Sequence, residues 1–331
     1  MKKILVTGAS GFIGSFIVEE ALRRGFETWA AVRKGSSRRY LRDGRIRFVE
    51  LNLDDAGDLR GKLSAVMPDY VVHAAGATKC LHADDFFRVN TQGTVNLASA
   101  VRDVCPGLER FVFISSLSVC GPVRETAPYT EITAADTPRP DTAYGRSKLE
   151  AERALDGMPG FPFIVLRPTG VYGPREKDYF MMAESIKKHV DFAAGLRPQD
   201  LTFIYVKDLV EAVFLALDHG NTGSRYHLSD GNVYPSRAFS DLIRRELGDP
   251  WLLRVKAPLW LLRAITAAGE AVGRLTGRMT ALNNDKYKIM RQRNWRCDIG
   301  PAVAELGFRP RYGLAEGVRE AIEWYKENKW L

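Results

Sequence analysis

The first half of the chain alternates short apolar runs with segments of helical periodicity. The runs are ILVT, TWAAV, IRFVEL, YVVHAA, FVFISS and FIVLRP. Each is apolar on both parities, as expected of strands that helices cover on both faces. Helices are predicted between them at residues 12–24, 56–66, 84–104 and 142–157, the last with Asp141 and Thr142 as candidate caps. This alternation predicts an α/β fold with a doubly wound parallel sheet.

The second half has a different pattern. Helices predominate beyond residue 170, with two brief apolar strands at residues 202–206 and 225–229. We interpret residues 171–331 as a smaller, mainly helical lobe beside a sheet domain at residues 1–170. Residues 202–218 are expected to return to the sheet.

Within this lobe, residues 259–275 are apolar at nearly every position. Arg263, Glu270 and Arg274 fall on one helical face, so the apolar arc is very wide. Three charges in so short a stretch exclude a membrane span. A helix buried in the lobe is the favoured interpretation, and a lid over an apolar substrate or a helix lying on a membrane surface are the alternatives.

The charge distribution and the cysteines indicate which partners, metal sites and compartment are expected. The 48 basic and 40 acidic residues are spread along the chain without a nucleic-acid motif, so attraction for anionic small molecules explains the net charge of +8 equally well. No nucleic-acid partner is expected. Cys80, Cys105, Cys120 and Cys297 lack metal-like spacing, which predicts a reducing compartment with neither a metal site nor disulfides. Glycines interrupt the N-terminal apolar run and no cleavage site follows it, so a cytoplasmic location is expected.

A glycine-rich turn, TGASGFIG, joins the first predicted strand to the first helix. Glycines suit a tight turn whose backbone approaches a pyrophosphate, and the helix N-terminus offers free N–H groups to the phosphates. A simple tight turn is the alternative, but the place at the start of a βαβ pattern favours a dinucleotide site. The candidate cofactor residues of this turn are Gly8, Ser10, Gly11, Phe12, Ile13 and Gly14.

The end of the second predicted strand bears on the choice of cofactor. An acidic side chain there would bind the ribose of NAD, and a basic one the 2′-phosphate of NADP. The strand ends in Val32, Arg33 and Lys34, with no carboxylate. Arg33 can hold a phosphate through a bidentate contact, so NADP is favoured over NAD. The alternative is that Arg33 is only a solvated surface charge.

Three residues carry the predicted chemistry. Ser116 ends a predicted strand, where open α/β sheets place their ligands. Tyr144 and Lys148 are four apart in AYGRSK, which places both on one face of a helix. An ammonium beside a phenol stabilises the phenolate, so Tyr144 can exchange a proton while hydride moves to or from a nicotinamide.

These motifs, together with HAAG, FISS and LRPTGVYGP, resemble the extended short-chain dehydrogenase/reductase superfamily, also described as the NAD-dependent epimerase/dehydratase family. The resemblance covers essentially the whole chain. It implies a Rossmann domain of about seven parallel strands, a C-terminal substrate lobe and a monomer or homodimer. It also implies Tyr144 as acid/base, Lys148 as the residue that binds the ribose and lowers the Tyr144 pKa, and Ser116 as the holder of the substrate oxygen. Further cofactor contacts implied are Asn52, Leu53, Ala74, Ala75, Gly76, Ser115, Tyr144, Lys148, Pro168 and Val171.

The chain departs from the family pattern at several positions. Asn52 and Cys120 stand where an aspartate and a tyrosine are common. Thr169 or Gly170 replaces an asparagine, and Leu201 and Thr202 replace an arginine, that bind the diphosphate in relatives acting on nucleotide-sugars. Loss of such charge-assisted contacts costs about 1.5–3 kcal/mol each, which disfavours that substrate class.

The RPTGVYGP stretch, Arg33 after the second predicted strand and the wide apolar helix resemble the 3β-hydroxysteroid dehydrogenase and dihydroflavonol reductase-like branch. The substrates of that branch are hydrophobic. We therefore predict NADP(H)-dependent interconversion of a ketone or aldehyde and an alcohol on a small hydrophobic substrate. One alternative is a nucleotide-sugar epimerase or dehydratase with tightly bound NAD(P), and a second is a non-catalytic NADP(H)-binding scaffold or sensor. Arg175, Lys177 and Tyr179 could recognise polar groups of the substrate or form a mobile charged loop.

Overall fold

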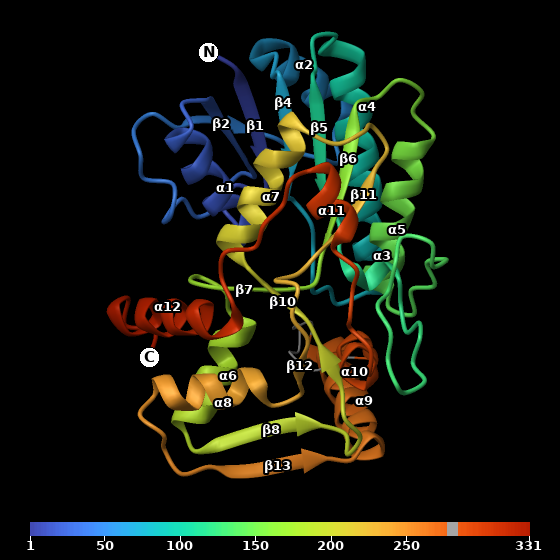
Figure 1. The fold of residues 1–331 in the computed structure, drawn as a ribbon. Coiled ribbons are helices and arrows are strands. Elements are labelled where there is room, and N and C mark those ends of the chain that lie inside the picture. Colours follow the sequence, from blue (N-terminus) through green and yellow to red (C-terminus); the bar gives the residue numbers. More distant parts are fainter. Residues whose placement is uncertain (277–283) are drawn as a thin grey trace.

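A computed structural model describes residues 1–276 and 284–331, apart from the side chains of Arg274 and Leu275. The predicted charge of Arg274 on the apolar helix therefore lies outside the described part. Seven parallel strands form the central sheet in the order β11-β6-β5-β4-β1-β2-β3 (Figure 1). They are β1 (Lys3–Thr7), β2 (Glu27–Val32), β3 (Arg47–Glu50), β4 (Tyr70–His73), β5 (Arg110–Ile114), β6 (Phe163–Pro168) and β11 (Arg225–Leu228). The predicted Rossmann-type sheet is confirmed.

Helices cover both faces of this sheet. Ile4 and Val6 of β1 pack in one hydrophobic cluster with α1 (Phe12–Arg23) and α7 (Val206–Asp218). Leu5 lies between them in sequence and packs in another cluster, with α2 (Ala56–Val66), α4 (Gly93–Val104) and α5 (Ala143–Asp156). Alternate strand residues thus enter opposite cores, which is why the runs are apolar on both parities.

The helices of the sheet half begin close to the predicted positions, because their caps are encoded locally. Asp55 accepts hydrogen bonds from the Gly57 and Asp58 N–H groups at the start of α2. Thr142 caps α5 by accepting from the Gly145 N–H at 2.9 Å. A continuous helical stretch holds α3 (Ala83–Phe86), the π-helical turn η1 (Phe87–Gln92) and α4, and the short 3₁₀ turn η2 (Leu117–Val119) follows β5.

The chain returns to the sheet differently from the expectation. The run at 202–206 forms β10 (Phe203–Tyr205), which pairs with β7 (Gly170–Tyr172) and not with the central sheet. The returning strand is β11, which pairs with β6 and comes from the 225–229 run that was assigned to the small lobe. The intervening α7 is apolar enough to cover the sheet, so it makes the crossover and its following strand becomes the sheet edge.

The remaining elements form the small lobe at the lower end of Figure 1. Its strands are β8 (Val190–Ala194) paired with β13 (Leu253–Ala257), and β9 (Asp200–Leu201) paired with β12 (Tyr234–Pro235). Its helices are α6 (Asp178–Lys187), α8 (Ala238–Glu246), α9 (Leu259–Thr276), α10 (Asn284–Arg291) and α12 (Leu314–Glu327), whereas α11 (Gly300–Glu305) packs near β11. Within the described residues, no helix is long and apolar enough to cross a membrane.

The apolar segment at 259–275 forms α9, but the interpretation of a buried helix is wrong. Leu262 is 1% exposed, whereas its neighbour Trp260 is 72% exposed and Ile265 and Val272 are also exposed. The helix buries one narrow stripe and leaves a wide apolar face uncovered. Periodicity alone could not reveal this, because it reports which positions are apolar and not how many neighbours exist to cover them.

Candidate active site

Most of the predicted site residues meet in one cleft at the carboxyl ends of the parallel strands. The cleft has a volume of about 550 Å³. The predicted residues that line it are Gly8, Gly11, Phe12, Ile13, Gly14, Ala74, Gly76, Ser115, Ser116, Tyr144, Lys148, Pro168 and Val171. Residues from five separated stretches of sequence are thus brought to one edge of the sheet, as the fold requires of its ligand site.

Five predicted contacts do not line this cavity among its described lining residues. Ser10 and Ala75 are half-buried beside residues that do. Leu53 faces Gly93, and Asn52 is exposed, where its side chain accepts from the Asp54 N–H at 3.2 Å. Arg33 is exposed directly after β2. A contact between these residues and a cofactor remains a prediction.

The glycine turn leaves room where side chains would clash. Gly8 has φ +67°, and a Cβ there would lie 2.7 Å from the Ala74 carbonyl carbon. A Cβ on Gly14 would lie 2.1 Å from the Gly8 oxygen. Gly11 caps α1 without a side-chain hydrogen bond, and the first turn of α1 holds no acidic residue. The N–H groups of this turn therefore fit a diphosphate, as a dinucleotide would present.

Helix α5 places Tyr144 and Lys148 in the same cleft. The Lys148 ammonium is buried and donates to the Ile114 carbonyl at 2.9 Å. Burial lowers the pKa of Lys148 to about 8, and attraction by Glu152 opposes this shift. Burial also raises the pKa of Tyr144, which a hydrogen bond with Ser116 partly offsets. The direction for Tyr144 is opposite to the one expected from Lys148 alone, because removing a phenolate from water has the larger effect.

A buried ion cluster that the sequence analysis did not find holds α5 against the sheet. Glu152 lies one turn after Lys148, is fully buried and binds Arg167 of β6 at 2.5 Å. It also pairs with Arg225 of β11 at 3.3 Å and accepts a hydrogen bond from Ser115. The arginine inside the otherwise apolar run FIVLRP was the signal for this cluster, since a buried charge needs a partner.

His73 is a structural residue. Its ring nitrogens bond to Thr7 at 2.7 Å and Thr94 at 2.9 Å, and burial lowers its pKa to about 3. Both nitrogens are occupied by hydroxyls and the ring stays neutral. Cys120 is equally inert, because burial raises the pKa of its thiol to about 11.

Helix α10 brings further residues to the mouth of the cleft. Asp285 accepts a hydrogen bond from the Tyr144 N–H at 3.2 Å. Asp178 pairs with Lys79 and, at 3.3 Å, with Lys286. The Asp285 contact ties the small lobe to the first turn of α5, and the Asp178–Lys79 pair ties it to the segment after β4. No local sequence pattern predicts these contacts, since the partners are more than 90 residues apart.

A second cavity of about 390 Å³ adjoins the cleft and shares Ser116, Thr169 and Tyr179 with it. The described residues that line it include no charged side chain. Its apolar wall consists of Phe192, Ala193, Ala194, Leu201, Phe203, Phe239, Ile289, Met290 and Trp295. The Thr169 hydroxyl donates to the Thr202 carbonyl at 2.8 Å and the Thr202 hydroxyl donates to the Trp295 carbonyl at 2.5 Å, so both hydroxyls have partners within the protein. The cavity can therefore take an apolar group next to Ser116, which lines both spaces.

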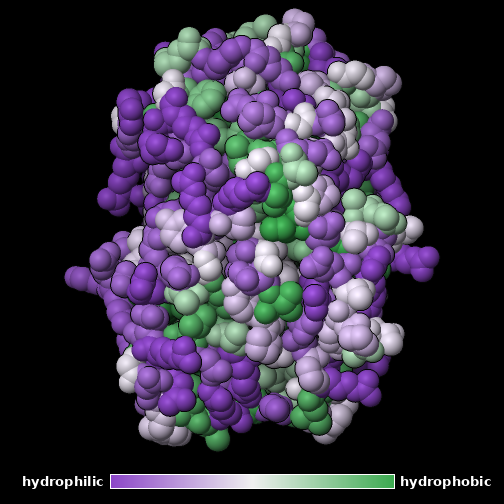
Figure 2. Space-filling view, in the orientation of Figure 1, coloured by the Kyte–Doolittle hydropathy of each residue, from purple (hydrophilic) through white to green (hydrophobic). Residues whose placement is uncertain are grey.

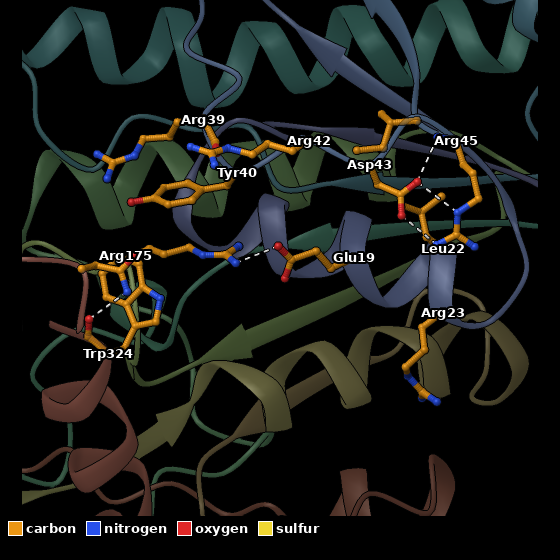
Figure 3. A pocket seen from close by; sticks show the side chains of 12 residues that line it. Glu19, Leu22, Arg23, Arg39, Tyr40, Arg42, Asp43, Arg45, Arg175 and Trp324 are labelled. Atoms are coloured by element: carbon orange, nitrogen blue, oxygen red, sulfur yellow. Dashed lines mark hydrogen bonds and ion pairs between the residues drawn. The ribbon is translucent and has the colours of Figure 1, made fainter. Parts of the chain in front are cut away.

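Arg175 lies elsewhere, in an arginine-lined pocket of about 520 Å³ beside α1 (Figure 3). Its guanidinium donates to Ser15 at 2.9 Å and to Glu19 at 2.7 Å. This pocket and the cleft share no lining residue within the described chain. Of the loop residues considered for substrate recognition, Tyr179 lines the cleft and Arg175 does not.

Comparisons with known proteins agree with this geometry. UDP-glucose 4-epimerase of Vibrio cholerae is 27% identical over 97% of this chain and 95% of its own. A putative dihydroflavonol 4-reductase of Synechocystis is 26% identical over 98% of this chain and 95% of its own. The solved structure of MoeE5 in complex with UDP-glucuronic acid and NAD matches with a TM-score of 0.76 and 26% identity over 98% of this chain and 99% of that one.

The model of the NAD dependent epimerase/dehydratase family matches residues 4–229, which include all three predicted catalytic residues and the central sheet except for Lys3 of β1. Relatives of this family cover nearly the full length of the chain. The chain belongs to the NAD dependent epimerase/dehydratase family and is an NAD(P)-dependent enzyme of the extended short-chain dehydrogenase/reductase type.

Proposed function

We propose that the protein catalyses reversible oxidoreduction at an alcohol carbon of its substrate, with Tyr144 as acid/base. The observation that carries this proposal is the cleft itself, in which Ser116, Tyr144 and Lys148 line the same space as the glycine turn. A nicotinamide dinucleotide bound on that turn supplies the acceptor or donor of hydride. The intact set of three residues also argues against a non-catalytic scaffold.

Tyr144, Lys148 and Ser116 have different roles in the proposed proton transfer. The raised pKa of Tyr144 keeps its phenol protonated at neutral pH, ready to donate to a carbonyl oxygen. The Lys148 ammonium, with a pKa of about 8, is still largely charged there and stabilises the phenolate that donation leaves. Ser116 lines the cleft beside Tyr144 and opposes the rise of the Tyr144 pKa, so it is placed to orient the substrate oxygen against that residue.

For the substrate, we propose a nucleotide-sugar first. The relatives support this class, which the sequence analysis ranked second, better than they support a hydrophobic ketone. The epimerase of Vibrio cholerae and the MoeE5 complex both carry nucleotide-sugars in their names. An enzyme of this kind would oxidise a sugar hydroxyl transiently and keep its cofactor bound through turnover.

A hydrophobic ketone or secondary alcohol is the second candidate, and the adjoining cavity favours it. Among its described lining residues there is no guanidinium or ammonium to neutralise a diphosphate. Leu201 lines the wall, at a position that we aligned with the diphosphate-binding arginine of relatives acting on nucleotide-sugars. The 26% identity to a putative dihydroflavonol 4-reductase is consistent with this candidate.

For the cofactor, NADP remains our proposal on the strength of Arg33, although the MoeE5 relative is named with NAD. The exposed guanidinium follows β2 without a neighbouring carboxylate in the VRKGSS segment. We also propose a cytoplasmic location, which the four unpaired thiols support. The domain division is proposed as residues 1–170 and 171–331, with α7 and β11 returning to the first.

Product analysis separates the two substrates. The purified protein is incubated with UDP-, GDP- and dTDP-hexoses without added cofactor, and with apolar ketones plus NADPH. A new nucleotide-sugar without cofactor consumption supports the first candidate, and stoichiometric NADPH oxidation by a ketone supports the second. If Tyr144→Phe retained the full rate in either assay, the proposed chemistry would be wrong.

A further inference from the structure

The small lobe exposes apolar side chains on three neighbouring elements. Figure 2 shows hydrophobic side chains reaching the surface at the lower end of the molecule, where β8, β13 and α9 lie in Figure 1. We call this set the apolar platform. Its members are Val190, Phe192, Leu196, Trp251, Leu253, Trp260, Leu261, Ile265 and Val272, all exposed.

On the two-stranded sheet, the platform is the face turned away from α8. Asp191 and Arg254 are paired across the strands and bind Arg237 and Asp241 at the α8 side. Alternation along the strands places Val190, Phe192 and Leu253 on the opposite face. No described element covers those side chains, and Leu253 is 58% exposed.

Helix α9 adds a helical stripe to the platform. Leu261, Ile265, Ala268 and Val272 follow one another at spacings of three or four and are all exposed. The stripe beside it consists of Trp260, Ala264, Ala267 and Ala271, which are exposed as well. A helix that offers an unbroken apolar face to water indicates a binding surface.

The charges around the platform identify its chemistry. In residues 187–197 and 251–273, the exposed charged side chains are all basic: Lys187, Lys188, Arg197, Arg254, Lys256 and Arg263. Lys188 and Arg254 pair with Glu184 and Asp241, and the exposed Asp249 before Trp251 pairs with Arg244 at 3.5 Å. The acidic residues of these two segments are buried, as Asp191, or half-buried, as Glu270. An apolar face with a basic rim and exposed tryptophans matches the interface of an anionic lipid bilayer.

We propose that the apolar platform docks this protein on the surface of a bilayer that carries anionic headgroups. A second copy of the chain fits less well, because a two-fold interface would bring the basic rim of one protomer against that of the other. The association is peripheral, since no described helix is able to span a bilayer. Phe192 also lines the second cavity, which shares Ser116 with the cleft, so the platform adjoins the site. The proposal does not depend on which reaction that site performs.

Vesicle sedimentation of the full chain with bound NADPH tests the proposal. We expect binding to vesicles of phosphatidylcholine with phosphatidylglycerol, weaker binding to phosphatidylcholine alone, and loss of the difference at high salt. Trp260→Ser with Ile265→Ser should weaken binding at least about tenfold. Met67→Ser, an exposed apolar residue of the sheet half, is the matched control and should change nothing.

Charge variants sharpen the test. Arg197→Gln and Arg263→Gln should each weaken binding to anionic vesicles about fivefold, and Arg102→Gln on the sheet half should not. NADPH titration and thermal melting confirm that each variant is folded. No sedimentation of the parent with anionic vesicles would overturn the proposal. So would a parent that is dimeric by light scattering and becomes monomeric in the Trp260→Ser, Ile265→Ser variant without having bound lipid.

Discussion

The sheet half and the small lobe differ in how many large apolar side chains they expose. Up to residue 170, charged groups such as Lys148, Glu152 and Arg167 are buried and bonded, and the exposed large hydrophobic side chains are Met1 and Met67. The small lobe exposes Met181, Val190, Phe192, Leu196, Val233, Trp251, Leu253, Trp260, Leu261, Ile265 and Val272. Buried, satisfied polar groups fix the catalytic helix in one position, whereas exposed apolar faces gain only from a partner outside the chain.

The largest effect expected is on catalysis in the sheet half. Tyr144→Phe removes the proton donor from the cleft and should lower kcat by about 10²–10⁴ while leaving NADPH binding unchanged. Tyr129→Phe, whose hydroxyl bonds to the Pro198 carbonyl outside the cleft, is the control. Steady-state kinetics with either substrate class measures the effect. A rate equal to that of the parent would show that Tyr144 of α5 does not carry out the proton transfer.

The next effect is on stability. Glu152→Gln leaves Arg167 buried without its carboxylate partner and should cost about 3–5 kcal/mol of unfolding free energy. Glu150→Gln changes the same charge on the exposed side of α5 and should alter stability by less than about 0.5 kcal/mol. Urea denaturation compares the two. Equal midpoints would mean that the ion cluster does not position the catalytic helix.

The sequence could predict the features of the sheet half that depend on local patterns, but not those that depend on contacts between separate segments. The caps at Asp55 and Thr142 and the glycine turn are local patterns, so the helices and the cofactor cleft of the sheet half were predictable. The Glu152–Arg167 pair and the Asp285 contact join residues distant in sequence, and no local pattern encodes which charges will meet. The strand that returns to the central sheet is β11, which pairs with β6. This pairing depended on which strand of the sheet was free to pair, and a local pattern does not show that.

The small lobe was less predictable for a related reason. Periodicity identifies the apolar positions of α9, but burial depends on how many other elements pack against them. The structure supplies neighbours for Leu262 and Thr266 and leaves Leu261 and Ile265 exposed. The wide apolar arc of α9, which is typical of a core helix, therefore belongs to a helix at the surface.

Two adjacent leucines of α9, one buried and one exposed, allow the difference between its two sides to be measured. Leu262→Ala creates a cavity in the lobe and should cost about 2–5 kcal/mol of unfolding free energy. Leu261→Ala, on the exposed side, should cost less than about 0.5 kcal/mol. Thermal and urea unfolding of the lipid-free protein compare them directly. Similar costs for both would show that the platform is already covered in the free protein.

A smaller effect is expected on cofactor choice. If Arg33 binds the 2′-phosphate, Arg33→Gln should raise the Kd of NADPH about tenfold or more and leave the Kd of NADH unchanged. Lys34→Gln, which removes an adjacent exposed charge, should have a weaker effect because an ammonium cannot make the bidentate contact. Fluorescence titration gives both constants. Tighter binding of NADH than NADPH by the parent would reject the proposed selectivity.

The smallest effect expected is a shift in pH dependence, which tests whether the buried charges of the sheet half act on one another. Lys148 has a folded pKa of about 8, below its usual value, so it loses its proton as the pH rises through about 8. The rate of carbonyl reduction should therefore fall above that pH, because the phenolate left on Tyr144 loses its neighbouring cation. Glu152 raises the pKa of Lys148, so Glu152→Gln should move the alkaline limb to lower pH, by a few-fold in rate near neutrality. The Glu150→Gln profile should coincide with that of the parent. If the alkaline limb of the pH–rate profile stayed in place in Glu152→Gln, it would not report the titration of Lys148. The Glu152 carboxylate would then have a structural role without an electrostatic role in the cleft.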